Sequence, residues 1–154
     1  MNEEKSVAKV ISKVKILQKK KLVDEIIIMD SGSTDRTKEI VKAIARGFNP
    51  KVALLLLKQD YAFELIDMKD IAGKSKNTLQ RLKGRVIGKA GKSREEIERL
   101  TDCDISVYGK TVGIIGEQQQ VYIARQAVAM LLQGSMHKTV YSFLERKKKE
   151  MMFG

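Results

Sequence analysis

The stretch Ile87-Gly88-Lys89-Ala90-Gly91-Lys92 decides how the rest of the chain is interpreted. Two glycines separated by two residues allow a tight backbone turn, because glycine adopts positive φ angles without a steric penalty. On both sides of this stretch, apolar residues recur at helical spacing, so we expect a helix, a glycine turn and a second helix. A Gly-x-x-Gly pattern is common by chance, and the flanking segments must therefore decide what it means.

The segment before the glycine turn is strongly cationic. Residues 74–94 include eight basic side chains and no acidic one. Within it, Leu79, Leu82 and Val86 recur at the spacing of an amphipathic helix. After the turn we expect Ser93 to cap the second helix, since serine is favoured at that position. The pattern predicts a helix with a basic face that leads directly into the glycine turn.

Strands are expected on both sides of this helical pair. Residues 61–68 alternate between apolar and polar side chains; Ile105 and Val107 define a second strand, and Val112 and Ile114 a third, with a turn between them. A helix over residues 117–132 follows. The predicted order over residues 60–134 is therefore β-α-α-β-β-α.

The first 59 residues predict an α-β-α-α segment. Residues 3–20 have the spacing of an amphipathic helix, and residues 23–29 read as a buried strand. A third element, a helix, should end at Gly47, and Pro50 is well placed to open another helix through residue 57. Residues 135–154 predict a C-terminal helix with a basic tail. We expect three parts: 1–59, 60–134 and 135–154.

This order of elements resembles a type I KH domain, so the predicted fold class is α+β: a type I KH domain with a C-terminal helix, preceded by the α-β-α-α segment. The resemblance implies a loop that clamps about four nucleotides of single-stranded RNA. Glycines let phosphates approach the backbone, and nearby cations hold them. Val86, Ile87 and Ile105 would form an apolar floor for the bases. The candidate RNA-binding residues are Arg85, Ile87, Gly88, Lys89, Ala90, Gly91, Lys92, Arg94, Ser106 and Tyr108.

Composition agrees with a polyanionic partner and argues against several other classes. Thirty Lys and Arg against nineteen Asp and Glu give a formal net charge of +11, and neutralising phosphates releases counterions. With only Cys103 and His137 of their kinds, a disulfide or a Cys/His metal cluster is excluded, so no metal or cofactor is expected. No apolar run approaches the roughly 20 residues that span a bilayer. We expect a non-catalytic, cytoplasmic RNA-binding protein.

Four runs give a closer resemblance, over about residues 40–151. Residues 41–48, 81–89, 105–112 and 139–147 are similar to archaeal relatives of the pre-rRNA-processing KH protein known as partner of the Nob endonuclease. The resemblance implies an assembly factor that binds near the 3′ end of small-subunit rRNA. It also implies two protein partners, the Nob endonuclease and the alpha subunit of translation initiation factor two.

Residues 1–39 depart from that family, whose members begin with another KH-like module. Here residues 23–37, with Asp30 at a strand end, resemble the opening of a nucleotide-sugar glycosyltransferase, which suggests a fused chain; convergence of a short segment is the alternative. A fragment of this length lacks the later metal-binding motif and acceptor site of such enzymes. Two other functions remain open: a nucleotide-sugar-binding fragment, and a protein-interaction scaffold with only non-specific RNA contact.

Overall fold

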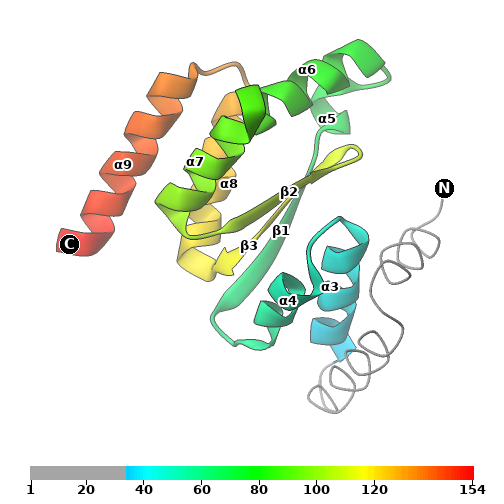
Figure 1. Ribbon diagram of the computed structural model, residues 1–154, viewed down its shortest axis with the longest axis vertical. Coiled ribbons are helices and arrows are strands. Elements are labelled where there is room, and N and C mark those ends of the chain that lie inside the picture. Colours follow the sequence, from blue (N-terminus) through cyan, green and yellow to red (C-terminus); the bar gives the residue numbers. More distant parts are fainter. Residues whose placement is uncertain (1–33) are drawn as a thin grey trace.

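The computed structural model describes residues 34–154, which form one three-stranded sheet with helices on both of its faces (Figure 1). The described elements are α3 (Thr34–Ala45), α4 (Pro50–Ala53), the 3-10 helix η1 (Leu54–Leu57), β1 (Tyr61–Asp67), α5 (Lys69–Ala72), α6 (Lys76–Ile87), the 3-10 turn η2 (Lys89–Gly91), α7 (Lys92–Thr101), β2 (Asp104–Tyr108), β3 (Thr111–Glu117), α8 (Gln118–Leu132) and α9 (His137–Phe153). The helix predicted over residues 3–20 and the strand predicted over 23–29 lie outside the described residues.

The sheet is antiparallel, with strand order β1-β3-β2. In its register Ile114 of β3 pairs with Glu64 of β1 on one side and with Ile105 of β2 on the other. From β1 to α8 the elements follow the predicted order β-α-α-β-β-α, with the short helix α5 added before α6. The α+β fold class and the type I KH arrangement are therefore confirmed.

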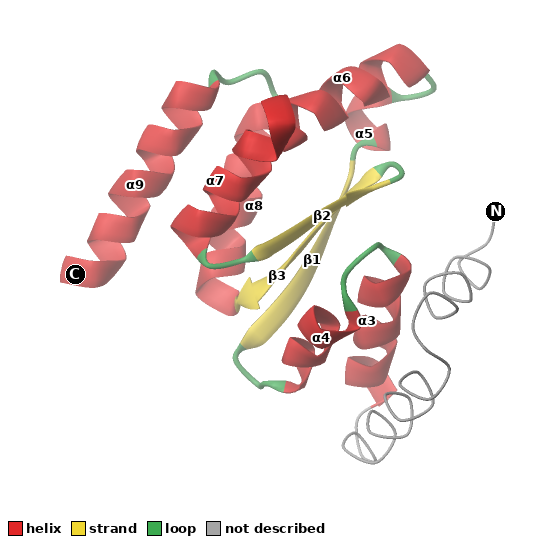
Figure 2. Ribbon diagram, viewed as in Figure 1, coloured by secondary structure: helices red, strands yellow, loops and turns green. Residues whose placement is uncertain are grey.

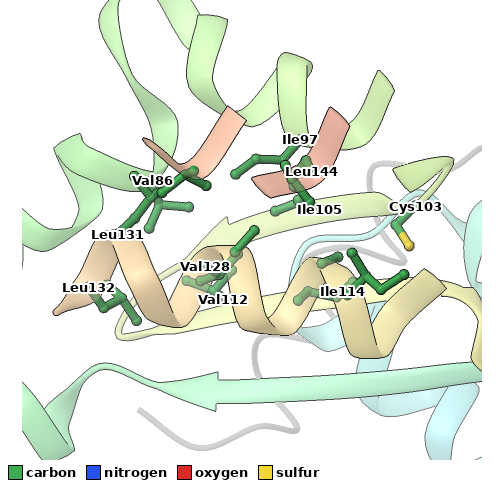
Figure 3. Close-up of a cluster of buried hydrophobic side chains, with 14 of the residues drawn as sticks. Val86, Ile97, Cys103, Ile105, Val112, Ile114, Val128, Leu131, Leu132 and Leu144 are labelled. Atoms are coloured by element: carbon green, nitrogen blue, oxygen red, sulfur yellow. The ribbon is translucent and has the colours of Figure 1, made fainter. Parts of the chain in front are cut away.

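The central strand β3 is buried on both faces because its side chains alternate between two hydrophobic clusters. Val112 and Ile114 belong to the cluster under α6, α7 and α8, whereas Ile115 belongs to the cluster under α3 and α4. Figure 2 shows these two groups of helices on opposite faces of the sheet. Figure 3 shows the first cluster, where Val128 and Leu131 of α8 lie against the sheet. We call these surfaces the α6–α9 face and the α3–α4 face.

Aromatic packing holds α3 and α4 on the sheet. The rings of Phe48 and Phe63 meet edge to face, with centroids 5.9 Å apart. Gly113 of β3 leaves room for this pair, because a Cβ at that position would lie 2.6 Å from Cε2 of Phe48. The strand that forms the middle of the KH sheet is thus also fitted to the helices that precede the KH elements.

The helix ends agree with the sequence predictions in part. Gly47, with φ +92°, follows the end of α3, and Pro50 stands in the first turn of α4 as expected. The predicted helix through residue 57 instead changes to the 3-10 helix η1 after Ala53. The predicted basic tail is also corrected, because α9 continues through residues 146–149 to Phe153. No helix among residues 34–154 is long and apolar enough to cross a membrane.

Candidate nucleic-acid interface

The glycine loop joins α6 to α7 through three residues with left-handed φ angles. These angles are +75° at Gly88, +55° at Ala90 and +77° at Gly91. Two of the three positions carry glycine, which adopts such angles without strain, and Ala90 carries the smallest side chain after glycine. The sequence therefore dictates a sharp reversal between the two helices, as predicted.

The two glycines are required for different reasons. At Gly88 a Cβ would lie 2.5 Å from Cβ of Ser93 and 2.7 Å from its backbone nitrogen, so a side chain there would collide with the first turn of α7. At Gly91 the atom nearest to an added Cβ would be Oε1 of Glu95, at 3.8 Å, an ordinary contact distance. Gly88 therefore provides both the backbone angle and the close approach, whereas Gly91 provides the angle and leaves the outer surface open.

The first turn of α7 presents backbone amides that no side chain caps. Gly91 occupies the N-cap position and offers no side-chain oxygen. The prediction that Ser93 caps this helix was wrong: Ser93 lies inside the first turn, is 1% exposed, and its Oγ has no hydrogen-bond partner. Unpaired amides and the positive end of the helix dipole are well suited to a phosphate oxygen.

Lys89, Ala90 and Lys92 lie exposed around this turn. Neither lysine forms an ion pair with another residue of the described range 34–154, so both ammonium groups are available to an outside anion. The exposure of Lys89 and Ala90 agrees with the expectation from sequence. Together with the α7 amides, these cations make the loop a compact site for a polyanionic backbone.

Arg85, predicted to flank the RNA path, is engaged inside the protein. Its Nε donates a hydrogen bond to the Leu131 carbonyl at 2.7 Å, and its Nη2 donates to the Ser135 carbonyl. Nε2 of His137 in turn donates to the Arg85 carbonyl at 2.8 Å, since a carbonyl can only accept. Arg85 thus fixes the end of α6, just before the glycine loop, to the end of α8 and the α8–α9 connection.

Arg94 is also paired within the chain. Its guanidinium forms an ion pair with the Glu98 carboxylate one turn further along α7. Partial burial raises the pKa of Glu98, while Arg94 and a hydrogen bond from the Ile105 backbone act in the opposite direction. An arriving phosphate would have to compete with Glu98 for Arg94, so this charge is less available than those of Lys89 and Lys92.

The predicted floor and edge of the base-binding surface are only partly found beside the loop. Val86 is 0% exposed and Ile105 is 5% exposed, so both belong to the core and cannot form a floor; Ile87 is half-buried. Ser106 donates a hydrogen bond from Oγ to the Arg46 carbonyl at 2.8 Å, which places it on the α3–α4 face of the sheet.

Tyr108 shares that face, because a Cβ at Gly47 would lie 3.1 Å from its Cδ2. Residues 106 and 108 alternate with the core residue 105 along β2, so they point away from the glycine loop. What β2 offers next to α6 is its outer backbone edge, since among residues 34–154 the strand pairs with β3 alone. This edge follows from the strand order β1-β3-β2 and could not be predicted from the side chains of β2.

The described residues contain no arrangement typical of a metal site or a thiol nucleophile. Among residues 34–154 there is no group of three or more His, Cys, Asp or Glu side chains that could hold a metal ion. Burial raises the pKa of the Cys103 thiol to about 12, which disfavours the reactive thiolate. Asp30, the acidic residue of the glycosyltransferase-like segment, lies outside the described residues.

Two family models match the chain in adjoining parts. Residues 62–149, more than half of the 154 residues, match the family described as eukaryotic type KH-domain (KH-domain type I). Residues 1–63 match the family described as glycosyl transferase family 2. The second match agrees with the glycosyltransferase-like start predicted from residues 1–39, and it reaches the beginning of β1.

Several known proteins resemble the chain over about three quarters of its length. KH domain-containing protein MJ0443 of Methanocaldococcus jannaschii is 53% identical over 116 residues, which cover 75% of this chain and 51% of that protein. Pre-rRNA-processing protein PNO1 of Debaryomyces hansenii is 32% identical over 117 residues, covering 75% and 46%. The chain therefore spans about half the length of these curated relatives, and neither name describes an enzyme.

A solved structure gives the same result for the fold. The chain resembles a chain in the a/eIF2alpha–aDim2p–rRNA complex from Pyrococcus horikoshii with a TM-score of 0.68 and 44% sequence identity. The match covers 75% of this chain and 62% of that chain.

Proposed function

The chain belongs to the PNO1/Dim2 family of KH-domain RNA-binding proteins in pre-rRNA processing, and from that premise we propose that its glycine loop binds single-stranded RNA at the 3′ end of small-subunit rRNA. The observation that supports this most directly is the loop itself. Lys89 and Lys92 are exposed and unpaired within the described chain, and they lie next to the uncapped amides at the start of α7.

In this mechanism the loop holds the RNA backbone and does no chemistry on it. A phosphate oxygen accepts hydrogen bonds from the α7 amides, and Lys89 and Lys92 neutralise the adjoining charges. Gly91 lets the strand approach without a side chain in the way. The bases turn toward Ile87 and the outer edge of β2, where backbone groups distinguish among them. Arg85 supports the loop through the α8–α9 connection, and Arg94 contributes only if it leaves Glu98.

The test compares a loop variant with a variant of equal charge change on the other face. Lys89→Asp combined with Ala90→Asp reverses the charge at the clamp; both positions are exposed, and aspartate tolerates the left-handed angle of residue 90. We expect RNA affinity to fall about 100-fold or more because a phosphate would face two carboxylates. The thermal midpoint should stay nearly unchanged.

The matched control is Asn49→Asp combined with Lys51→Asp at the start of α4. It changes the net charge by the same amount, and aspartate can replace asparagine as the N-cap of α4. The control should lower RNA affinity by less than about threefold, the effect of net charge alone. Equal losses in the two variants would leave only the overall charge of +11 as the cause.

The preference for rRNA is tested separately. Binding of a short RNA from the 3′ end of small-subunit rRNA is compared with binding of a scrambled RNA at two salt concentrations. A preference of about tenfold or more that persists as salt rises would mean that bases are read. Equal and steeply salt-dependent binding would contradict sequence reading and favour a protein-interaction scaffold with non-specific RNA contact.

We also propose the alpha subunit of archaeal initiation factor two as a protein partner, because a chain 44% identical to this one is part of a complex with that subunit and rRNA. Calorimetry with the isolated subunit, with and without RNA, tests this partner, and no binding in either case would reject it. The Nob endonuclease remains a prediction from family resemblance. Because the chain spans about half of its relatives' length, each partner has to be tested on this chain directly.

A further inference from the structure

A basic cleft lies at the opposite end of α6 from the glycine loop. It encloses about 570 Å³ between α5, the start of α6 and the turn that joins β2 to β3. In Figure 1 the tip of the β2–β3 hairpin lies next to α5 and the start of α6, so segments far apart in sequence meet there. The residues that line the cleft are Lys69, Ala72, Gly73, Lys74, Ser75, Lys76, Leu79 and Lys110.

The charge of this cleft has one sign. Four of its lining residues are lysines and none is acidic. All four lysines are exposed, and none forms an ion pair with another residue in the described part of the chain. Asp67 and Asp70 flank Lys69 in sequence and are exposed, but neither forms an ion pair with a cleft lysine among the described residues; Oδ1 of Asp67 accepts a hydrogen bond from the Lys69 amide at 2.9 Å. Four like charges that converge with no ion pair among residues 34–154 repel one another, and an anion that bridges them relieves the repulsion.

The open entrance and the lining groups of the cleft suit a phosphate of a chain ligand. Gly73 carries no side chain, and a Cβ there would meet nothing within 4 Å, so the entrance is open to a ligand's backbone. Oγ of Ser75 accepts a hydrogen bond from the Thr78 amide and caps α6, and its O–H can still donate to a phosphate oxygen. The lysine point charges and the Ser75 hydroxyl all suit phosphodiester oxygens, and none of them reads a base.

The distance to the glycine loop matches the path of one RNA strand. The cleft and the loop lie at the two ends of α6, whose twelve residues span about 18 Å at about 1.5 Å per residue. About five stacked nucleotides at about 3.4 Å each cover that length. A strand clamped over about four nucleotides by the loop therefore reaches the cleft only when it is longer than the clamp requires.

We propose that Lys69, Lys74, Lys76 and Lys110 form a second phosphate-binding site that holds the same RNA strand beyond the nucleotides clamped by the glycine loop. This inference rests on the proposed RNA binding and gives it a direction, from the loop along α6 to the β2–β3 turn. The second site adds affinity and fixes the course of the strand, while sequence preference stays with the loop.

The test uses RNA of two lengths and four forms of the full chain: the unchanged protein, the loop variant, a cleft variant and a control variant. One RNA has about four nucleotides, the number that the clamp holds, and the other has about twelve, enough for both sites. The cleft variant replaces Lys74, Lys76 and Lys110 by glutamine. The control variant replaces Lys42, Lys51 and Lys149 by glutamine, which removes the same charge from three exposed lysines on α3, α4 and α9. Affinities are measured by fluorescence anisotropy over a series of salt concentrations.

We expect the cleft variant to bind the longer RNA about tenfold to a hundredfold more weakly near 0.1 M salt, with a salt slope shallower by about 2, because three phosphate contacts are lost. Its affinity for the shorter RNA should change by less than about threefold, as should that of the control variant for either RNA. Equal losses for both RNA lengths, or no loss for the longer RNA, would overturn the second site. The loop variant separates the two ideas: if it binds both RNAs normally, the proposed clamp fails whatever the cleft does.

Discussion

The two faces of the sheet share one central strand but differ in size and in role. Among residues 34–154, nineteen buried residues form the core on the α6–α9 face, whereas seven form the cluster on the α3–α4 face. The glycine loop is attached to the larger core through Val86 and Ile97, which lie in the helices on either side of it and are 0% exposed. The loop is thus fixed by the best-packed part of the molecule, which preorganises it for a ligand.

The comparison also shows what side-chain type alone cannot reveal. Ser106 and Tyr108 lie on β2, the first strand after the glycine loop. Because side chains alternate along a strand, both point to the α3–α4 face. The same alternation buries Ile105 under α6. Of the ten predicted site residues, those in the loop lie together at an exposed turn, and the two on β2 are used to attach the N-terminal helices.

Truncating one isoleucine on each face of β3 gives the largest expected effect. Ile114→Ala opens a cavity in the larger cluster and should lower the free energy of unfolding by about 3 to 5 kcal/mol. Ile115→Ala, one residue further along, should cost about 2 to 3 kcal/mol because the smaller cluster can relax around it. Urea denaturation measures both. Equal losses, or a larger loss at Ile115, would contradict the assignment of the main core to the α6–α9 face.

The second-largest effect should be a difference in stability between alanine variants of the two loop glycines. Gly88→Ala meets both a left-handed angle and a contact 2.5 Å from Ser93, so we expect a loss of about 2 to 4 kcal/mol. Gly91→Ala meets the angle alone, so about 1 to 2 kcal/mol is expected. Urea unfolding of the two variants checks the difference. Similar losses would show that Ser93 moves aside and that the close approach is not needed.

Arg85 and Lys89 separate a supporting cation from a binding one. Arg85→Gln loses charge-assisted hydrogen bonds to two carbonyls and should destabilise the protein by about 2 kcal/mol, with RNA affinity of the folded protein changed by less than about threefold. Lys89→Gln should alter stability by less than about 0.5 kcal/mol and weaken RNA binding by about fivefold. The opposite pattern would return Arg85 to the RNA path as the sequence first suggested.

Most of the fold could be predicted because local patterns and chain order agreed. Alternation over residues 61–68, helical spacing through Leu82 and Val86, and the glycine turn each specified one element, and together they left one common arrangement. Finer details escaped prediction. The change from α4 to η1 after Ala53 depends on packing under the sheet, and α9 continues through its basic run because Val140 and Leu144 anchor it on α7 and α8.

The part of the candidate site that depends on local backbone angles could be predicted from the sequence. The part that depends on packing between distant segments could not. Gly88 and Gly91 have positive φ angles that only their residue type signals, so the loop was found from sequence. The partners of Arg85 lie 46 and 50 residues away, beyond any local pattern. The basic cleft was missed for the same reason, because Lys110 joins Lys74 only through the fold.

Mapping a bound RNA on the amides of the chain tests the central claim most directly. In an NMR titration with a short RNA from the 3′ end of small-subunit rRNA, we expect the largest shifts at residues 88–94 and along the edge of β2 that no other described strand pairs with. Amides of α3 and α4 should hardly move, since they lie on the opposite face. Shifts centred on α3, Ser106 and Tyr108, with the glycine loop unchanged, would contradict the account and assign RNA binding to the other face of the sheet.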